Sequence, residues 1–429
     1  MSLLSRLHRR RPAARSEARA AQATRPTAFG LAVLTTLTAF TALGPAATPA
    51  QAEPEDCPRG YFCAWKTDHA TGEMLKLTKS AATLGAWDNQ ISAVSNRTNQ
   101  WVCGYDEPGY TTSYWSVGVR DPDPGGTEWG YMGMHSLSSL KFVLTARECY
   151  GPAYPSWHAE PNPAPQPSRF GNLNGDDEAD LLARDKAGRL WFLPGDGNGK
   201  LVGGGWGAMN ALTRHGDFSA DGKEDVIARE ASTGKLYLYP GTGTGALGAR
   251  KVIGTGGWNA MTRLTAFGDL TGDGRSDLLA VEKSTGKLWL YPGTSTGALG
   301  ARKLIGAGGW NSMNALTALG DVTGDGKADL VAREPASGKL WLYPGRTGTL
   351  GSRALIGGGW NVMAQLVGVG DHGYDGSNDL IALTNNAFRS TSCSYQGCLM
   401  IYGGRDNGTF APGSWDGHDR SWNDMSTVF

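Results

Sequence analysis

The sequence predicts an all-β protein, with a small disulfide-bonded domain followed by a β-propeller of about five blades. Glycine supplies 63 of the 429 residues, roughly twice the usual share of about 7%, and so much glycine disfavours long helices. All six cysteines lie after residue 52. The second half of the chain repeats short apolar and aromatic runs between glycine-rich turns at a period near 50. These three observations indicate sheets joined by turns and disulfides.

Charge excludes one broad class of function. Basic and acidic residues balance at 40 each, but the first 52 residues hold seven arginines and a single acid, Glu17. The rest of the chain therefore carries a net charge of −6. Nucleic-acid binding requires a basic face, so this mildly acidic body predicts no nucleic-acid partner.

The N-terminus has the pattern of an export signal. An arginine-rich stretch ends at Arg25, an uncharged run extends over residues 26–49, and small residues follow at Ala50-Gln51-Ala52. This order is typical of a cleaved secretory signal peptide. A membrane anchor is the alternative, but the apolar part over 28–43 has about 16 residues, and a span needs about 20. We therefore expect residues 1–52 to be removed and the mature protein to be secreted, with no membrane attachment.

The cysteines agree with export. An even number of cysteines in an exported chain is typical of a disulfide framework. A zinc site would need paired CxxC motifs or clustered histidines, and the sequence has neither. Separation along the chain favours two local disulfides and one longer loop: Cys57–Cys63, Cys393–Cys398 and Cys103–Cys149.

A proline-rich stretch divides the exported part into two bodies. Residues 151–168 contain six prolines and no periodic apolar pattern. This composition predicts a semi-rigid, extended linker. It separates a domain of residues 53–150 from a repeat region of residues 169–429.

The repeat region contains five acidic loops at nearly equal spacing. Runs such as DLLAVE and KLWLYPG, between these loops, have the branched and aromatic residues of short strands. A period near 50 built from such runs and glycine turns indicates a propeller blade. The loops begin at Asn172, Asp217, Asp269, Asp321 and Asp371, which are 45, 52, 52 and 50 residues apart.

The end of the chain predicts how the ring closes. The last residues, WNDMSTVF, resemble the WNAMTRLTAF segment that precedes an acidic loop, and no loop follows them. The first loop, in contrast, has no GGW segment before it. We therefore expect the C-terminal segment to complete the first blade and to leave no open sheet edge.

The acidic loops carry the most informative chemistry. The third and fourth loops both read DxTxDGxxD. Oxygen-bearing side chains at positions 1, 3, 5 and 9, with glycine at position 6, match the first part of a calcium-binding loop. An Asp-Gly turn with solvated carboxylates is the alternative, but recurrence at a fixed spacing favours calcium. The predicted ligands are Asp269, Thr271, Asp273 and Asp277 in the third loop, and Asp321, Thr323, Asp325 and Asp329 in the fourth.

On these loops, residues 169–429 resemble the FG-GAP/VCBS-type calcium-binding β-propellers. The resemblance implies further sites, with two departures from the pattern: Asp177 replaces the turn glycine of the first loop, and Gly373 removes one ligand from the fifth. The implied ligands are Asp217, Ser219, Asp221 and Asp225 in the second loop, Asn172, Asn174, Asp176 and Asp180 in the first, and Asp371, Asp375 and Asp379 in the fifth.

The tryptophans of the GGW segments have two candidate roles. They can stack on sugar rings, as in propeller lectins, or they can fill the wedge between blades. Packing is the commoner use of large flat side chains, while the flanking glycines leave room for a ligand. The stacking candidates are Trp258, Trp310 and Trp360.

The first domain has aromatic segments beside its cysteines. It opens with the segment CPRGYFCAW from Cys57, and later carries YDEPGY from Tyr105. On these segments it resembles an actinobacterial metallopeptidase-inhibitor family with the βγ-crystallin fold. The resemblance implies Greek-key motifs and an extracellular protease as partner. Ala70 and Thr112 depart from the pattern of the aromatic corners.

The sequence gives little sign of a common enzyme. The histidines are scattered, and HExxH does not occur. GxSxG occurs once, as GTSTG from Gly293, but the preceding repeat has GTGTG from Gly241 at the same place, which indicates a turn of the repeat. Paired carboxylates for glycoside hydrolysis stay open as a possibility. We therefore predict a non-enzymatic secreted binding protein, whose calcium-stabilised propeller serves extracellular recognition and whose first domain inhibits a peptidase. The alternative is a lectin or cell-wall-binding propeller with a glycan partner, in which the first domain is only structural.

Overall fold

The computed structural model describes residues 56–117, 128–131, 136–159, 170–176, 178–390, 393, 397–415 and 420–429. The expected signal peptide, residues 1–52, lies outside these residues. Every regular element in the described ranges is a β-strand or a short 3-10 helix, which confirms the all-β prediction. Within the same ranges, no helix has the length and apolar character needed to cross a membrane.

The first domain consists of two antiparallel sheets that exchange strands. Their orders are β2-β1-β3-β6 and β5-β4-β7. The strand β6 follows β5 in the chain but pairs with β3 of the other sheet, and Ala81, which precedes β3, forms a bridge with Leu140 of β7. Each half of the domain therefore contributes to both sheets, which is the Greek-key arrangement that the resemblance implies.

The elements of this domain are short. They are β1 (Phe62–Trp65), β2 (Met74–Leu77), η2 (Gly85–Trp87), β3 (Ala93–Asn96), β4 (Trp101–Glu107), β5 (Thr111–Val117), β6 (Glu128–Tyr131), β7 (Ser139–Val143) and η3 (Ala146–Cys149).

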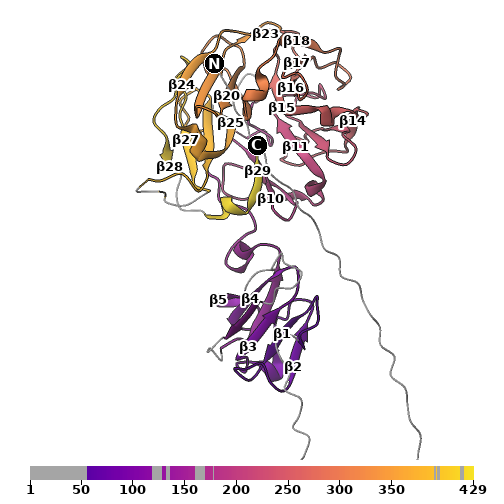
Figure 1. Cartoon of the computed structure of the whole chain (residues 1–429), viewed down its shortest axis with the longest axis vertical. Helices are drawn as coiled ribbons and strands as arrows, with labels where there is room; N and C mark the ends of the chain where they lie inside the picture. Colours follow the sequence, from indigo (N-terminus) through magenta and orange to yellow (C-terminus); the bar gives the residue numbers. More distant parts are fainter. Residues whose placement is uncertain are drawn as a thin grey trace, which may run out of the picture. The chain divides into compact units, whose positions relative to one another are not determined.

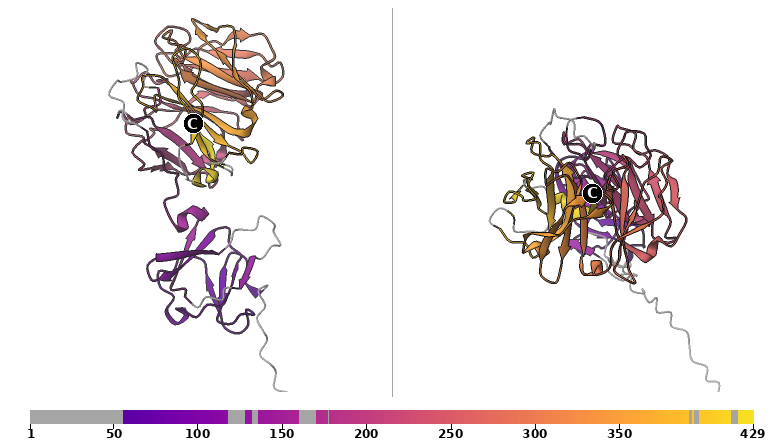
Figure 2. Two further views of the ribbon diagram at one scale, coloured as in Figure 1. Left: turned by 90° about the vertical axis from the view of Figure 1, so that its left-hand side faces the viewer. Right: turned by 90° about the horizontal axis from the view of Figure 1, so that it is seen from above.

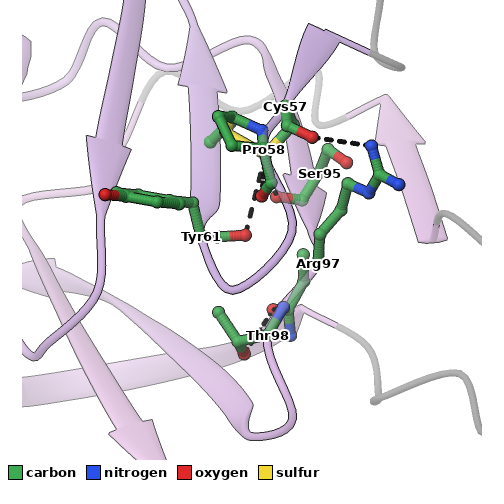
Figure 3. Close-up of a disulfide and its surroundings, with 8 residues drawn as sticks. Cys57, Pro58, Tyr61, Ser95, Arg97 and Thr98 are labelled. Atoms are coloured by element: carbon green, nitrogen blue, oxygen red, sulfur yellow. Dashed lines mark hydrogen bonds between the residues drawn. A yellow bond between two sulfur atoms is a disulfide. The ribbon is translucent and has the colours of Figure 1, made fainter.

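Disulfides stabilise this small domain at two points. Cys103–Cys149 connects β4 to η3, and Cys57–Cys63 closes the loop before β1. Arg97 donates a hydrogen bond from Nη1 to the carbonyl oxygen of Cys57 at 2.7 Å, which ties that loop to the turn after β3 (Figure 3). A third disulfide, Cys393–Cys398, lies in the repeat region. The three disulfides are the pairs that separation along the chain favours.

Five four-stranded antiparallel sheets make up the described part of the repeat region. They follow one another in sequence order, from magenta to yellow, around one centre (Figure 1). The innermost strands β11, β15, β19, β25 and β29 together line a central cavity of about 130 Å³. The repeat region is therefore a five-bladed propeller, as predicted.

Each blade has four strands. In blades 2 to 5 an acidic loop connects the innermost strand to the second strand, whereas in blade 1 the acidic loop precedes the second strand, β8, and the innermost strand is the C-terminal β29. Blade 1 contains β8 (Leu181–Asp185), β9 (Leu190–Leu193), β10 (Lys200–Gly203) and β29 (Met425–Val428). Blade 2 contains β11 (Met209–Arg214), β12 (Val226–Glu230), β13 (Leu236–Tyr239) and β14 (Lys251–Gly254). Blade 3 contains β15 (Met261–Gly268), β16 (Asp277–Glu282), β17 (Leu288–Tyr291) and β18 (Lys303–Gly306).

The last two blades follow the same plan. Blade 4 contains β19 (Ala315–Gly320), β20 (Asp329–Glu334), β21 (Lys339–Tyr343) and β24 (Ala354–Gly357), with a small hairpin of β22 (Gly345–Arg346) and β23 (Thr349–Leu350). Blade 5 contains β25 (Met363–Gly370), β26 (Asp379–Thr384), β27 (Leu399–Tyr402) and β28 (Ser414–Trp415). The 3-10 helices are η4 (Trp206–Ala208), η5 (Trp258–Ala260), η6 (Trp310–Ser312), η7 (Trp360–Val362) and η8 (Arg420–Asp424).

The C-terminal segment closes the ring. Strand β29 pairs antiparallel with β8, and Phe429 exchanges two backbone hydrogen bonds with Leu182, at 2.8 and 2.9 Å. The left view of Figure 2 shows this yellow end of the chain beside magenta strands. Trp422, Met425 and Val428 are buried in the contact between blades 5 and 1. The segment therefore supplies the strand that the first repeat lacks, as predicted.

Arginines from the second strands hold neighbouring blades together. Arg229 of blade 2 donates from Nη1 to the carbonyl oxygens of Trp258 and Met261, at 2.8 and 2.6 Å, in the turn that begins blade 3. Arg184 and Arg333 make the same pair of contacts from blades 1 and 4. Blades 3 and 5 have Val281 and Leu383 at this position.

We expect deletion of residues 421–429 to leave the propeller unfolded or aggregated. The deletion exposes two sheet edges and removes four buried apolar side chains, each contributing roughly 1.5–3 kcal/mol. A typical folded domain is stable by only about 5–15 kcal/mol. Circular dichroism and size-exclusion chromatography test this directly. A truncated protein that stays monomeric and melts like the full chain would contradict the closing role of β29.

Candidate metal centre

Each acidic loop is organised around its last carboxylate. In the second loop, Asp225 Oδ2 accepts hydrogen bonds from the backbone N–H groups of Phe218 and Ser219, at 2.8 and 2.6 Å, and Oδ1 accepts one from Gly241 at 2.8 Å. Gly241 lies in the turn between the third and fourth strands of the same blade. This one side chain therefore connects the acidic loop to a turn on the outer half of the blade. Asp277, Asp329 and Asp379 make the same three contacts in the third, fourth and fifth loops.

The first carboxylate of each loop fixes the turn. Asp217 accepts backbone N–H groups from Asp221 at 3.1 Å and from Gly222 at 2.7 Å. Gly222 has a φ angle of +81°, a conformation that favours glycine over other residues. The third, fourth and fifth loops repeat this contact with a glycine of similar φ. The positive φ angle at this position thus explains why glycine follows the second aspartate of the motif.

The second loop brings its predicted ligands together. Oxygen atoms of Asp217, Asp221 and Asp225 all lie within 4.8 Å of one another, the one such group of three among the described residues. The hydroxyl of Ser219 lies 3.4 Å from Asp217 and 3.5 Å from Asp225. Asp225 is buried, whereas Asp221 is exposed, so the cluster faces solvent on one side. Oxygen ligands of this kind suit a hard cation such as calcium.

The third and first loops use their side chains differently. In the third, Arg275 forms an ion pair with Asp273 at 3.1 Å. In the first, the side-chain amides of Asn172 and Asn174 donate to Asp176, and Asp177 lies outside the described residues. Their ligand sets stay predictions.

The fourth and fifth loops keep the hydrogen bonds of the first and last carboxylates. Asp321 and Asp329 hold the fourth loop in this way, and Asp371 and Asp379 hold the fifth. In the fifth loop, Gly373 offers no side-chain ligand. The ligand sets of these two loops also stay predictions.

Burial makes the ionised form of the last aspartate in each acidic loop less favourable. The pKa of Asp225 is raised to about 6, mainly by desolvation, with a smaller contribution from the nearby carboxylates of Asp217 and Asp221. Burial likewise raises the pKa of Asp379 to about 6 and that of Asp180 to about 8. A cation beside these groups would favour their ionised forms. The second loop therefore combines the ligands for a cation with an electrostatic reason to bind one.

A polar cavity lies where the loops of blades 2 to 5 meet. It has a volume of about 540 Å³, and Asp217, Asp269 and Asp321 line it together with Arg275 and Lys327. Asn378 also lines it, with 7% of its surface exposed. The amide nitrogen of Asn378 donates to the Asp321 carbonyl at 2.9 Å, while its buried Oδ1 has no hydrogen-bond partner among the described residues. Because this oxygen is buried, it does not reach a ligand in the cavity, whereas the acidic and basic side chains of the lining suit a small polar ligand.

The GGW tryptophans pack inside the propeller, so at Trp310 and Trp360 the structure favours the packing alternative over sugar stacking. These two side chains expose only 9% and 8% of their surface, and Trp258 is half-buried. Their ring centroids lie 4.7–4.8 Å from tyrosine rings at the ends of the third strands. Rings so enclosed have no free face for a sugar. They fill the wedge between blades instead.

The fold and the loops define a class of protein, with a Greek-key domain and a five-bladed propeller whose acidic loops lie on one face. Residues 50–117 match the model of peptidase inhibitor family I36. Residues 217–280 and 269–332 match the model of the FG-GAP-like repeat. Both resemblances drawn from the sequence are thus confirmed for the segments that match.

Several solved structures are similar to this chain. An Agrocybe aegerita lectin that recognises non-reducing terminal N-acetylglucosamine is 17% identical, over 61% of this chain and 70% of the lectin, with a TM-score of 0.36. The GH43 protein BlXynB from Bacillus licheniformis is 14% identical over 65% of this chain and 57% of its own, with a TM-score of 0.36. The Dos1 propeller is 9% identical over 59% and 69%, with a TM-score of 0.28. No curated protein matches the chain. At these TM-scores the likeness carries no argument about function.

Metal-free protein should lose stability through Asp225 as the pH rises from about 4 to about 6. The unfolded chain releases this proton near the ordinary value of 3.8, whereas the folded chain keeps it up to about 6. Ionisation therefore favours the unfolded state in that window, by on the order of 3 kcal/mol once it is complete. Urea unfolding of the wild type and Asp225→Asn at several pH values measures the difference. A difference that is constant with pH would contradict the raised pKa.

Proposed function

We propose that this protein is a secreted, non-enzymatic binding protein, in which a calcium-stabilised propeller carries a peptidase-inhibitor domain. The observation that supports the calcium role is the group formed by Asp217, Asp221 and Asp225. The match of residues 50–117 to peptidase inhibitor family I36 supports the inhibitor role. The signal pattern in residues 1–52 supports export.

Calcium in the second loop would stabilise more than that loop. Asp217, Ser219, Asp221 and Asp225 would supply its oxygen ligands, and the ion would offset the repulsion among three carboxylates. Because Asp225 also binds Gly241 of the outer turn, an ion that favours its ionised form strengthens contacts across the whole blade. A ligand that binds only the folded state shifts the folding equilibrium by mass action.

Calcium should raise the melting temperature of the full chain, and a chelator should lower it. At about one hundred times the dissociation constant, a single site adds about 2.7 kcal/mol. Asp221→Ala should reduce the bound calcium by about one ion, as measured by calorimetry or metal analysis, and Asp68→Ala, an exposed aspartate of the first domain, serves as the control. Asp273→Ala and Asp325→Ala test the third and fourth loops in the same way. Identical melting curves with calcium and with chelator would exclude the proposed role.

The full chain should inhibit a zinc metalloendopeptidase. The family resemblance implies this target class, and the two disulfides of the first domain give the rigidity that a peptidase inhibitor needs. The measurement is hydrolysis of a fluorogenic peptide by the enzyme as the full chain is titrated in, with a serine peptidase as the control. If the zinc enzyme keeps its full activity in molar excess of the chain, the inhibitor role is wrong.

The cavity on the loop face supports a second candidate function, the binding of a glycan or cell-wall component by the propeller. Its lining carboxylates, together with Arg275 and Lys327, favour a hydroxyl-rich ligand. A glycan array probed with the full chain tests this, and Lys327→Ala and Arg275→Ala should weaken any signal. In that case the first domain would be a structural companion. A signal that both variants retain would place glycan binding elsewhere on the molecule.

A further inference from the structure

The turn between the third and fourth strands is shorter in blade 1 than in its neighbours. Blades 2 and 3 have PGTGTGALGARK from Pro240 and PGTSTGALGARK from Pro292, whereas blade 1 has only PGDGNGK from Pro194. The five residues that are missing include the single leucine of the turn. Blade 1 therefore lacks a side chain that the other turns provide.

In the other blades this apolar residue packs at the contact between two neighbouring blades. It forms a β-bridge or a short hairpin pair with a glycine near the start of the turn, which follows a proline in blades 2 to 4 and Gly403 in blade 5. It also packs against the hydrophobic cluster shared with the preceding blade. The residues are Leu247, Leu299, Leu350 and Phe410, paired with Gly241, Gly293, Gly345 and Gly404 in blades 2 to 5.

Residues from the predicted linker take this place in blade 1. His158 forms an antiparallel bridge with Asp196, one residue beyond the position that is bridged in blades 2 to 4, and the N–H of Ala159 donates to the Gly195 carbonyl at 3.0 Å. The bridge lies in the shortened turn. The preceding residue, Trp157, is only 1% exposed and belongs to the hydrophobic cluster of blades 5 and 1.

Polar contacts hold Trp157 and its neighbours to both blades at the seam between them, where "seam" means the contact between two neighbouring blades. The indole Nε1 of Trp157 donates to the Ala179 carbonyl at 2.7 Å, in blade 1. On the blade 5 side, the ring of His372 lies 4.9 Å from that of Trp157, and its Nε2 lies 2.9 Å from the carbonyl oxygen of His158. A linker that only passed over the surface would not bury the indole of Trp157 or provide a hydrogen-bond acceptor for its N–H. This segment is therefore packed into the propeller.

We infer that the groove between blades 5 and 1 is a peptide-binding site that the chain fills with its own residues 153–159. The site takes an extended segment that offers one large aromatic side chain and a backbone N–H group. The segment replaces the missing outer turn of blade 1, so the propeller begins at residue 153 and not at residue 169. Trp157, next to the bridged His158, supplies the apolar side chain at the contact with the preceding blade, and it is larger than the leucine of the other turns.

Substitutions in the full chain test this assignment. Trp157→Ala should lower the melting temperature of the propeller by about 6–12 °C, because loss of a buried tryptophan is costly, and should raise amide exchange in β8 and β26. Phe410→Ala is the matched variant at the seam of blades 4 and 5, and should raise exchange there. Trp157→Leu, which copies blades 2 and 3, should recover most of the lost stability. Pro152→Ala, at an exposed position, is the control and should melt like the wild type.

A synthetic peptide of residues 152–160 gives a readout of binding itself. Added in excess, it should raise the melting temperature of Trp157→Ala, while the same peptide with alanine in place of Trp157 should have no effect. A Trp157→Ala protein with wild-type melting and exchange would overturn the inference. Exchange that rises equally at all five seams, with no response to the peptide, would also overturn it. The test needs no metal or inhibitor activity, so it is independent of the proposed function.

Discussion

The buried aspartate that ends each acidic loop is the contact on which the propeller depends. In four blades its two oxygens receive three backbone N–H groups, two from the loop and one from a turn 16 or 25 residues further along the chain. Hydrogen bonds to an ionised acceptor are stronger than neutral ones, and buried N–H groups left without partners would be costly. A pattern typical of a metal site therefore has a structural task in every one of these blades.

That double role explains why the second loop differs from the rest. The last aspartate must be buried to reach the outer turn, and burial makes its charge unfavourable. In the second loop, the carboxylates at the first and fifth positions lie close enough to share a cation with it. In the third loop, the guanidinium of Arg275 pairs with the fifth-position carboxylate of Asp273 at 3.1 Å. The same motif therefore places its fifth-position side chain in different contacts in neighbouring blades.

The features that the sequence predicted correctly are mostly those that show as similarity between repeats. The similarity of WNDMSTVF to an internal segment was enough to predict the closing strand, because β29 occupies the position that its counterparts occupy. Close spacing was enough for the local disulfides. The role of Trp310 was not decided, since a GGW turn is compatible with both packing and ligand binding. A tyrosine recurs 33 residues after the tryptophan in blades 2, 3 and 4, and it is the residue against which each ring packs.

The place of Trp157 could not be predicted from its own surroundings. Its proline-rich neighbourhood is typical of a linker, and its partners in blade 5 lie more than 200 residues away. The available signal was indirect: a turn in blade 1 that is five residues too short. Similarly, spacing places three carboxylates in the second and third loops alike, but it does not show that Arg275 pairs with Asp273. The contacts of Trp157 are distant in sequence, whereas the ion pair of Arg275 depends on the conformation of its own side chain.

Because the blade-joining arginines are unevenly distributed, two contacts between blades are held in other ways. Arg184 and Arg229 join blades 1, 2 and 3, and Arg333 joins blades 4 and 5. Between blades 3 and 4, the hydroxyl of Thr265 donates to the Leu316 carbonyl at 3.2 Å, and the N–H of Gly348 donates to the Leu270 carbonyl at 2.6 Å. Between blades 5 and 1, Trp157 fills the contact. The ring is therefore completed there by a residue from outside its own repeats.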